Sequence, residues 1–266
     1  MVLLEAFGIR QCFGGLVALD QVSFKVQAGT IKAVIGPNGA GKTTLFNIVS
    51  GIFPPTAGKI VLEDRQITGL KPFQVAALGI SRTFQNPSLF AHLSVLENVM
   101  VGRHGRTYGG LFNCSLRLPA QRRAEREARD FALDCLDRVG LAWMASESAQ
   151  ALSFGQRRMV ELARALATEP KLLLLDEPAS GLNTRETGDL AKLIGRIRQS
   201  GVTILLVEHD MALVMEISDD ILVLHFGTPI AEGPPAQIQN DPKVIAVYLG
   251  EDSNVAASKE PEMRLR

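Results

Sequence analysis

The chain has 266 residues, 46% of them apolar and 21% charged, and its formal net charge is zero. This composition is ordinary for a globular domain, and the lack of a basic excess argues against a nucleic-acid binder. Three cysteines lie far apart without metal-ligand spacing, which indicates reduced thiols rather than a disulfide framework. The N-terminus shows no secretory signal pattern, and no apolar run approaches the roughly 18 residues that cross a bilayer.

The first part of the chain is expected to combine antiparallel strands with one buried strand. Residues 21–27 alternate apolar and polar side chains, which is typical of a half-buried strand. Residues 58–67 are expected to form a hairpin around Glu63 and Asp64. The segment TIKAVI at 30–35 then leads directly into a glycine-rich loop. We therefore expect an antiparallel β subdomain beside a strand that ends in this loop.

The loop, GPNGAGKTT, has the spacing G-x-x-x-x-G-K-[ST] of a phosphate-binding loop. Its glycines let backbone N–H groups point at an anion, and the helix that begins near Lys42 adds the positive end of its dipole. Lys42 offers a charge to terminal phosphates and Thr43 a hydroxyl to Mg²⁺. A plain glycine-rich turn is the alternative, but the strand–loop–helix setting favours a nucleotide triphosphate. The expected nucleotide-binding residues are Gly36, Pro37, Asn38, Gly39, Ala40, Gly41, Lys42, Thr43 and Thr44.

Residues from about 88 to 156 differ in character and are expected to form an inserted α-helical subdomain. Between 119 and 141, apolar residues recur at helical spacing among interspersed arginines and acids. Because the acids offset the arginines, a solvated helix face is the preferred interpretation over a nucleic-acid surface. The apolar positions of this stripe are Ala124, Ala128, Phe131, Cys135 and Val139.

After residue 156 helices and strands alternate. Helices are expected over 156–168 and 184–200, and each precedes a continuous apolar strand, KLLLLDE or VTILLVEH. Such runs mark strands buried on both faces of a parallel sheet. A terminal hairpin is expected at 219–233. The prediction is an α/β fold in which residues 1–87 and 157–250 form a parallel-sheet core and 251–266 a flexible tail.

Two adjacent acids end the apolar strand LLLLDEP at 172–178. Asp176 is placed to hold Mg²⁺ near the phosphates, and Glu177 to orient or deprotonate the attacking water. A polar strand end is the alternative for this pair. A second candidate phosphate binder is Ser153 with Gly155, at the start of a helix. Taken alone, Ser153 fits a simple helix N-cap better.

The motifs as a set resemble an ABC-transporter ATPase subunit over roughly residues 1–250. They occur in the order GPNGAGKTT, RTFQNPSLF, LSFGQ, LLLLDEP, SGLN and VEHDM. The resemblance implies a RecA-like P-loop core, ATP and Mg²⁺ as cofactors, and ATP hydrolysis coupled to transport. It also names these segments: LSFGQ is the signature, SGLN at 180–183 the D-loop, and VEHDM holds the switch histidine.

The resemblance further implies roles for single residues. Gln85 would reach Mg²⁺ and the attacking water, and would couple the core to a membrane partner. His209 would contact the γ-phosphate, and Phe13 would stack on the adenine. Gln156 belongs to the signature with Ser153 and Gly155. The alternatives are a solvated glutamine, a strand-end histidine and a core phenylalanine.

Two positions depart from the commonest pattern of this family. Phe154 stands where the signature has glycine, and Asn183 where the D-loop has aspartate. With the long insertion at 102–120 and the C-terminal segment from 227, these departures resemble branched-chain amino acid importer ATPases. Subunits of related importers for urea or short amides, and of exporters, stay open.

The resemblance implies a head-to-tail dimer in which Ser153 of one subunit covers ATP held by the other. The expected partners are permease subunits, a second ATPase chain (self or sister) and, indirectly, a periplasmic or extracellular substrate-binding protein. The expected location is the cytoplasmic face of a bacterial inner or plasma membrane. A soluble ABC-type ATPase acting on nucleic acid or ribosomes would need a second core or a long coiled coil, and a GTPase an N-K-x-D motif; the sequence contains none of these.

Overall fold

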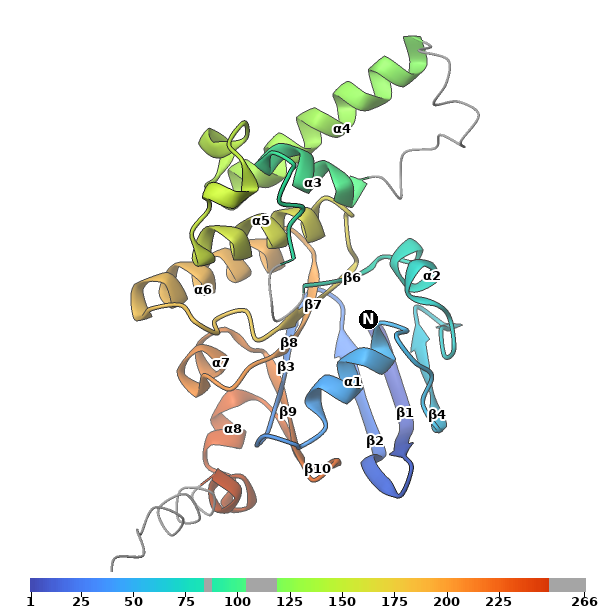
Figure 1. The fold of residues 1–266 in the computed structure, drawn as a ribbon. Helices are drawn as coiled ribbons and strands as arrows, with labels where there is room; N and C mark the ends of the chain where they lie inside the picture. Colours follow the sequence, from blue (N-terminus) through green and yellow to red (C-terminus); the bar gives the residue numbers. More distant parts are fainter. Residues whose placement is uncertain (84–87, 104–118, 249–266) are drawn as a thin grey trace, which may run out of the picture.

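A computed structural model describes residues 1–83, 88–103 and 119–248, with the side chains of 119–122 excepted. Gln85, most of the 102–120 insertion and the tail at 251–266 therefore lie outside the described residues. The described part holds an antiparallel sheet, a larger and mainly parallel sheet, and a group of helices beyond one edge of the latter (Figure 1). None of its helices is long and apolar enough to cross a membrane.

The antiparallel sheet has the strand order β2-β1-β4-β5. The expected strand at 21–27 is the second half of β2, and the expected hairpin joins β4 to β5. Glu63 and Asp64 have φ angles of 45° and 65°, the left-handed values that a tight two-residue hairpin turn requires. The strands are β1 (Val2–Phe13), β2 (Leu16–Gln27), β4 (Ala57–Leu62) and β5 (Arg65–Gln66).

The larger sheet has the order β10-β9-β3-β8-β7-β6, parallel except for the antiparallel pair β9–β10. The expected parallel core and the expected terminal hairpin are both confirmed. The strands are β3 (Ile31–Ile35), β6 (Ile80–Arg82), β7 (Leu172–Asp176), β8 (Thr203–Val207), β9 (Asp220–His225) and β10 (Thr228–Gly233).

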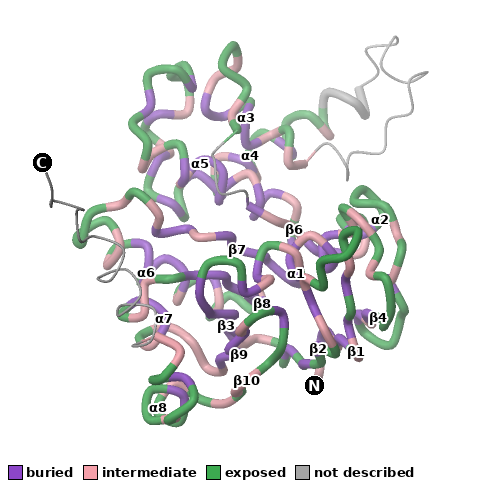
Figure 2. The backbone as a smooth tube through the Cα atoms, turned by 60° about the horizontal axis from the view of Figure 1, so that its bottom comes forward, coloured by how far each residue is buried: buried purple, intermediate pink, exposed green. Residues whose placement is uncertain are grey.

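Both faces of this sheet are covered, which explains the uninterrupted apolar strands (Figure 2). Leu172 and Leu174 of β7 pack toward α1 (Lys42–Val49) and the antiparallel sheet. Leu173 and Leu175 pack toward the helices on the other face. All five residues of β7 are consequently buried, because successive side chains of a strand point to opposite faces.

The helices on that second face include α5 (Phe154–Leu166) and α6 (Thr184–Gln199). Helix α5 also contacts α3 (Val95–Arg103) and α4 (Pro119–Arg138), so it joins the helical group to the sheet. It begins two residues before the expected start because Ser153 caps it. The remaining helices are α2 (Pro72–Ala77), α7 (Met211–Ile217), α8 (Pro235–Gln239) and the short 3₁₀ turns Ala142–Met144 and Ala149–Ala151.

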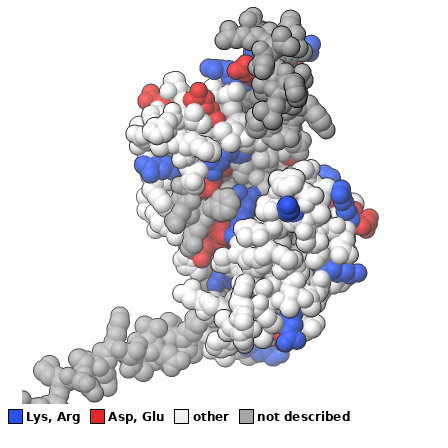
Figure 3. Space-filling model, turned by 45° about the vertical axis from the view of Figure 1, so that its right-hand side comes forward, with Lys and Arg blue, Asp and Glu red and all other residues white. Residues whose placement is uncertain are grey.

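Helix α4 carries the apolar stripe that the sequence indicates. Ala128, Cys135 and Val139 are buried, whereas the arginines at 126 and 129 are exposed, as a solvated face requires. On the surface drawn in Figure 3, basic and acidic side chains are interspersed. Among the described residues drawn there, no continuous basic patch is seen.

Candidate active site

Three strand ends meet at the carboxyl edge of the parallel sheet. Asp176 of β7 pairs with Val207 of β8, and Val207 pairs with Val34 of β3. Glu177 and Glu208 directly follow the first two of these positions, and the glycine-rich loop at 36–41 begins two residues after Val34. Ligands of open α/β sheets bind at this edge, so the register brings the predicted loop and the predicted acids to one place.

The glycine-rich loop lies close to β9 of the larger sheet and to β2 of the antiparallel sheet. A Cβ atom on Gly36 would lie 2.0 Å from the carbonyl oxygen of Leu224, and one on Gly41 would lie 2.7 Å from that of Ala18. Gly41, just before α1, has a φ of 99°, a value that L side chains rarely adopt. Both positions therefore require glycine, because any side chain there would collide with backbone oxygen atoms of β9 and β2.

Lys42, the first residue of α1, is buried and folds back over the loop. Its Nζ atom donates to the carbonyl oxygens of Gly36 at 2.5 Å and Pro37 at 2.8 Å. The next residue, Thr43, is exposed at the same helix end. A cation and a hydroxyl thus stand where the positive end of the helix dipole lies, an arrangement suited to phosphate oxygens.

Asp176 ends β7 in a buried ion pair. Its Oδ2 atom accepts from a guanidinium nitrogen of Arg82 at 2.7 Å, and both side chains are less than a tenth exposed. Arg82 also donates to Asn47 Oδ1 at 2.7 Å and Ser50 Oγ at 3.0 Å on α1. Arg82 therefore ties the carboxylate to the helix that follows the loop. Sequence reasoning missed Arg82, because an arginine that ends a short strand carries no signal of its partner.

The predicted Mg²⁺ site can be compared with the oxygen ligands that the structure offers at this edge. Among the described residues, no group of three or more His, Cys, Asp or Glu side chains could hold a metal ion alone. Mg²⁺ typically takes only one or two protein ligands and completes its shell with phosphate oxygens and water. Asp176 and the hydroxyl of Thr43 fit that requirement, whereas Gln85 lies outside the described residues.

Glu177 and His209 lie side by side. His209 Nδ1 is 3.9 Å from Glu177 Oε2 and 3.4 Å from Glu208 Oε2. Glu177 has a φ of 47°, a left-handed value that costs a non-glycine residue about 1–3 kcal/mol. Its N–H donates to Val207 O at 2.8 Å, which holds the strained residue against the end of β8. Two of the three predicted catalytic residues are thus neighbours.

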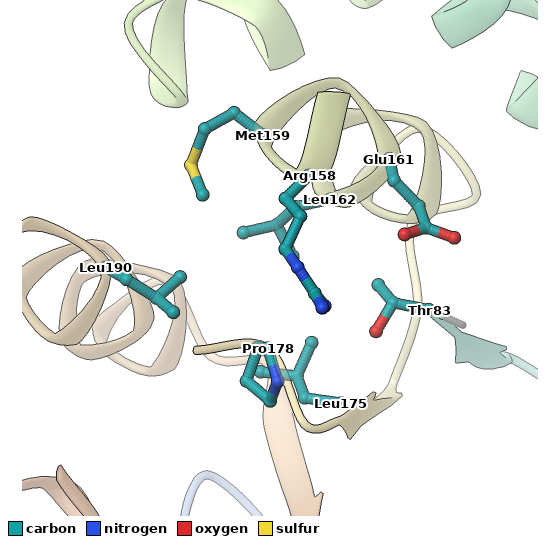
Figure 4. Close-up of a pocket in the computed structure, with 8 residues that line it drawn as sticks. All are labelled: Thr83, Arg158, Met159, Glu161, Leu162, Leu175, Pro178 and Leu190. Atoms are coloured by element: carbon teal, nitrogen blue, oxygen red, sulfur yellow. The ribbon is translucent and has the colours of Figure 1, made fainter. Parts of the chain in front are cut away.

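Arg158 projects from α5 into the space beneath these acids, between Thr83 and Pro178 (Figure 4). Burial lowers the pKa of its guanidinium, whereas the charges of nearby carboxylates raise it. Its guanidinium also lies 5.2 Å from the ring centroid of Phe154. Arg158 is therefore, with Arg82, a buried cation close to several carboxylates. These carboxylates belong to Glu161, Glu208, Glu177 and Asp176.

The signature residues lie at the exposed N-terminus of α5. Ser153 Oγ accepts from Gln156 N at 3.3 Å, and Gln156 Oε1 accepts from Ser153 N at 2.9 Å. This reciprocal pair is a capping box. Within one chain Ser153 thus serves as the helix cap that the sequence also allows. Its contact with a phosphate, and those of Gly155 and Gln156, stay predictions.

Two aromatic residues of the predicted site are exposed. Phe13 is 47% exposed at the β1–β2 turn and makes an edge-to-face contact with Phe53 at 5.6 Å between ring centroids. It is not a core residue, and its stacking on adenine stays a prediction. Phe154 lies against the D-loop, because a Cβ atom on Gly181 would come within 2.9 Å of its ring.

Comparison with known proteins agrees with this geometry. The ABC transporter family model matches residues 19–180, and a model of the branched-chain amino acid ATP-binding cassette transporter matches 228–254. The chain is 48% identical over 250 residues to the high-affinity branched-chain amino acid transport ATP-binding protein LivG of Salmonella typhimurium. It is 46% identical over 250 residues to BraF of Pseudomonas aeruginosa, a protein of the same description. Each alignment covers 94% of this chain and 98% of the relative.

Solved structures match over most of the chain as well. A nucleotide-free ATP-binding cassette from an ABC transporter matches with a TM-score of 0.82 and 32% identity, over 93% of this chain and 99% of that one. The cassette MJ0796, solved as a dimer in a post-hydrolysis state bound to ADP and Pi, matches with a TM-score of 0.74 and 25% identity. That alignment covers 88% of this chain and 99% of MJ0796. The chain belongs to the ATP-binding cassette family of ABC transporters, a family of nucleotide-binding ATPases.

Proposed function

We propose that this chain is the ATP-hydrolysing subunit that energises a membrane importer for branched-chain amino acids. The observation that carries the proposal is the 48% identity to LivG over 94% of the chain. The match of residues 228–254 to the branched-chain cassette model supports it independently at the C-terminal end. ATPase subunits of urea, amide or export systems are the alternatives that the test below separates.

In the proposed site the loop at 36–44 surrounds the phosphates of ATP. Lys42 exchanges its two carbonyl partners for β- and γ-phosphate oxygens, and the first-turn N–H groups of α1 add further donors. Asp176, Thr43 and Gln85 would hold Mg²⁺, which would supply positive charge to offset that of the phosphates. Phe13 supplies a surface for the adenine ring.

Glu177 is the proposed general base. Its carboxylate lies beside His209 at the edge of the sheet, where a water could stand in line with the γ-phosphate. His209, whose side chain is 62% exposed, would contact the γ-phosphate beside Glu177. The strained backbone of Glu177 fixes the direction of the carboxylate before the nucleotide arrives.

The second phosphate binder is proposed to act between chains. Ser153, Gly155 and Gln156 face outward from one subunit and cover the ATP of another in a head-to-tail dimer, the partner being a copy or a sister chain. Permease subunits hold this dimer at the cytoplasmic face of the bacterial membrane, and a substrate-binding protein acts on the far side. The division into a core (1–87, 157–250) and a helical subdomain (about 88–156) belongs to this proposal.

Reconstitution tests the proposed function. The chain, co-expressed with its neighbouring permease and ATPase genes, is placed in vesicles with ATP inside or outside, and uptake of radiolabelled leucine, urea and acetamide is compared. We expect leucine uptake that requires ATP on the ATPase side and fails with Glu177→Gln. Uptake of urea or acetamide but not of leucine would show that the transported substrate is not a branched-chain amino acid. Export of leucine would show that the transporter is an exporter.

A further inference from the structure

Glu208 is a buried carboxylate that links two segments of the proposed site within one chain. We propose that Glu208 is a positioning residue that holds the D-loop and the switch histidine in one fixed arrangement, so that a shift of either segment is transmitted to the other. This inference rests on the proposed roles of Glu177 and His209 in hydrolysis.

The geometry places Glu208 between the two segments. Its Oε1 atom accepts from the N–H of Ala179 at 2.8 Å, directly before the D-loop at 180–183. Its Oε2 atom accepts from the N–H groups of His209 at 2.8 Å and Asp210 at 3.3 Å. One carboxylate thus receives three backbone donors from segments 29 residues apart in sequence.

The side chain has no access to water. Glu208 is 0% exposed, so its oxygens depend on the protein for hydrogen bonds. Both oxygens act only as acceptors in this network, as an ionised carboxylate does. Arg158 supplies a nearby positive charge. The charge of the Glu208 carboxylate raises the pKa of the Arg158 guanidinium, so the two groups attract each other. Replacing one of the two Glu208 oxygens by an NH₂ donor would leave at least one of these three N–H groups without an equivalent acceptor.

The tether joins the backbone next to the D-loop to the backbone of the switch histidine. Ala179 begins a tight turn in which Leu182 N donates to Ala179 O at 3.0 Å, so Ala179 anchors the D-loop. Oε2 also lies 3.4 Å from His209 Nδ1, which orients the imidazole ring as well as its backbone. The D-loop lies next to Phe154 of the signature segment, which is proposed to face the neighbouring subunit in the dimer. Contact with that subunit would therefore reach His209 through a single side chain.

Amide-resolved hydrogen exchange and steady-state ATP hydrolysis test the proposal on the full-length chain. Glu208→Gln keeps the shape of the side chain but replaces one acceptor with an NH₂ donor. We expect the amides of Ala179, His209 and Asp210 to exchange faster together, while β7 and β8 stay protected. We expect kcat to fall by about 10- to 100-fold, because a misplacement of about 1 Å at a catalytic group costs this much. The affinity for ATP should stay close to wild type, since Lys42 and its loop are untouched.

Glu161→Gln is the matched control. Glu161 is a 3% exposed carboxylate that also acts on Arg158, but it lies on α5, outside the two tethered segments. We expect normal exchange at the three amides and little change in kcat. Glu208→Asp, which keeps the charge on a shorter side chain, should recover part of the lost kcat.

Three results would overturn the proposal. The first is unchanged exchange at the three amides in Glu208→Gln, and the second is faster exchange with wild-type kcat. The third needs no variant: exchange of these amides in the wild-type protein at the rate of an unprotected peptide. Hydrogen exchange is measured without nucleotide, so it still tests the tether if the wild-type chain fails to hydrolyse ATP, a result that would defeat the proposed function instead.

Discussion

Arg82 and Asp176 form a buried ion pair with 2.7 Å between nitrogen and oxygen, and Arg82 continues this contact to Asn47 and Ser50 on α1. The pair places the carboxylate that is proposed to hold Mg²⁺ at a fixed position relative to the helix that follows the phosphate loop. Because both side chains are buried, the loss of either one would leave the other charge buried without a counter-charge.

Arg82→Met is therefore expected to destabilise the protein. Removing one partner of a buried pair leaves an uncompensated charge and typically costs about 3–5 kcal/mol in the free energy of unfolding. Urea denaturation followed by circular dichroism measures it. Arg123→Met, which removes an exposed pair with Glu127 on α4, is the control and should leave the urea midpoint nearly unchanged. Equal midpoints for both variants would refute the structural role of Arg82.

Lys42→Ala is expected to weaken ATP binding itself. The Nζ atom of Lys42 donates to two carbonyl oxygens of the loop, and it can donate to phosphate oxygens instead when ATP binds. The loss of a hydrogen bond between charged groups, about 1.5–3 kcal/mol, corresponds to a rise in Kd of about 10- to 100-fold. Titration with a fluorescent ATP analogue measures Kd. Lys25→Ala, which removes an exposed lysine from β2, is the control, and an unchanged Kd for Lys42→Ala would count against the loop assignment.

Glu177→Gln should separate binding from hydrolysis. The variant keeps the side-chain shape but loses the group that accepts a proton from water, so turnover should fall by about two to four orders of magnitude while ATP still binds. Phosphate release and nucleotide titration give the two quantities. Asp189→Asn on the exposed face of α6 is the matched carboxylate control. Near-normal turnover in Glu177→Gln would show that Glu177 is not the general base.

The residues behind these predictions differ in how far the sequence could reveal them. Asp176 and Glu177 follow a strand whose apolar run predicts its burial, and the neighbouring motif supplies their chemistry. Arg82 pairs with Asp176 across 94 residues of sequence, and Glu208 reaches Ala179 across 29. Neither contact has a local pattern, because each arises only when the strand register and the loops are in place. An acid directly after the apolar run of β8 is the one signal that could have drawn attention to Glu208.

Cys135 should report on the packing of the helical region. Burial raises the pKa of its thiol from 9.0 to about 11, with a smaller opposing effect of Arg138. The unfolded chain loses this proton at lower pH than the folded chain, so the contribution of Cys135 to stability should decrease as pH rises from about 9 to 11. The thiol should resist iodoacetamide at pH 8 until denaturant is added. Mass spectrometry of labelled peptides measures this, with the partly exposed Cys12 as internal comparison. Equal labelling of both thiols in the native protein would contradict the packing of α4.

The last prediction concerns assembly. In the proposed dimer each ATP is held by Lys42 and Asp176 of one chain and covered by Ser153 of the other. Because ATP that bridges two chains stabilises only the dimer, activity per chain should rise with protein concentration. In a homodimer, mixing Ser153→Arg with Glu177→Gln should restore part of the activity, since one of the two sites combines both changes and the other is intact. If the partner is a sister chain, this rescue requires the sister chain. Light scattering and ATPase assays over a range of concentrations measure both effects, and full activity from a strict monomer would defeat either arrangement.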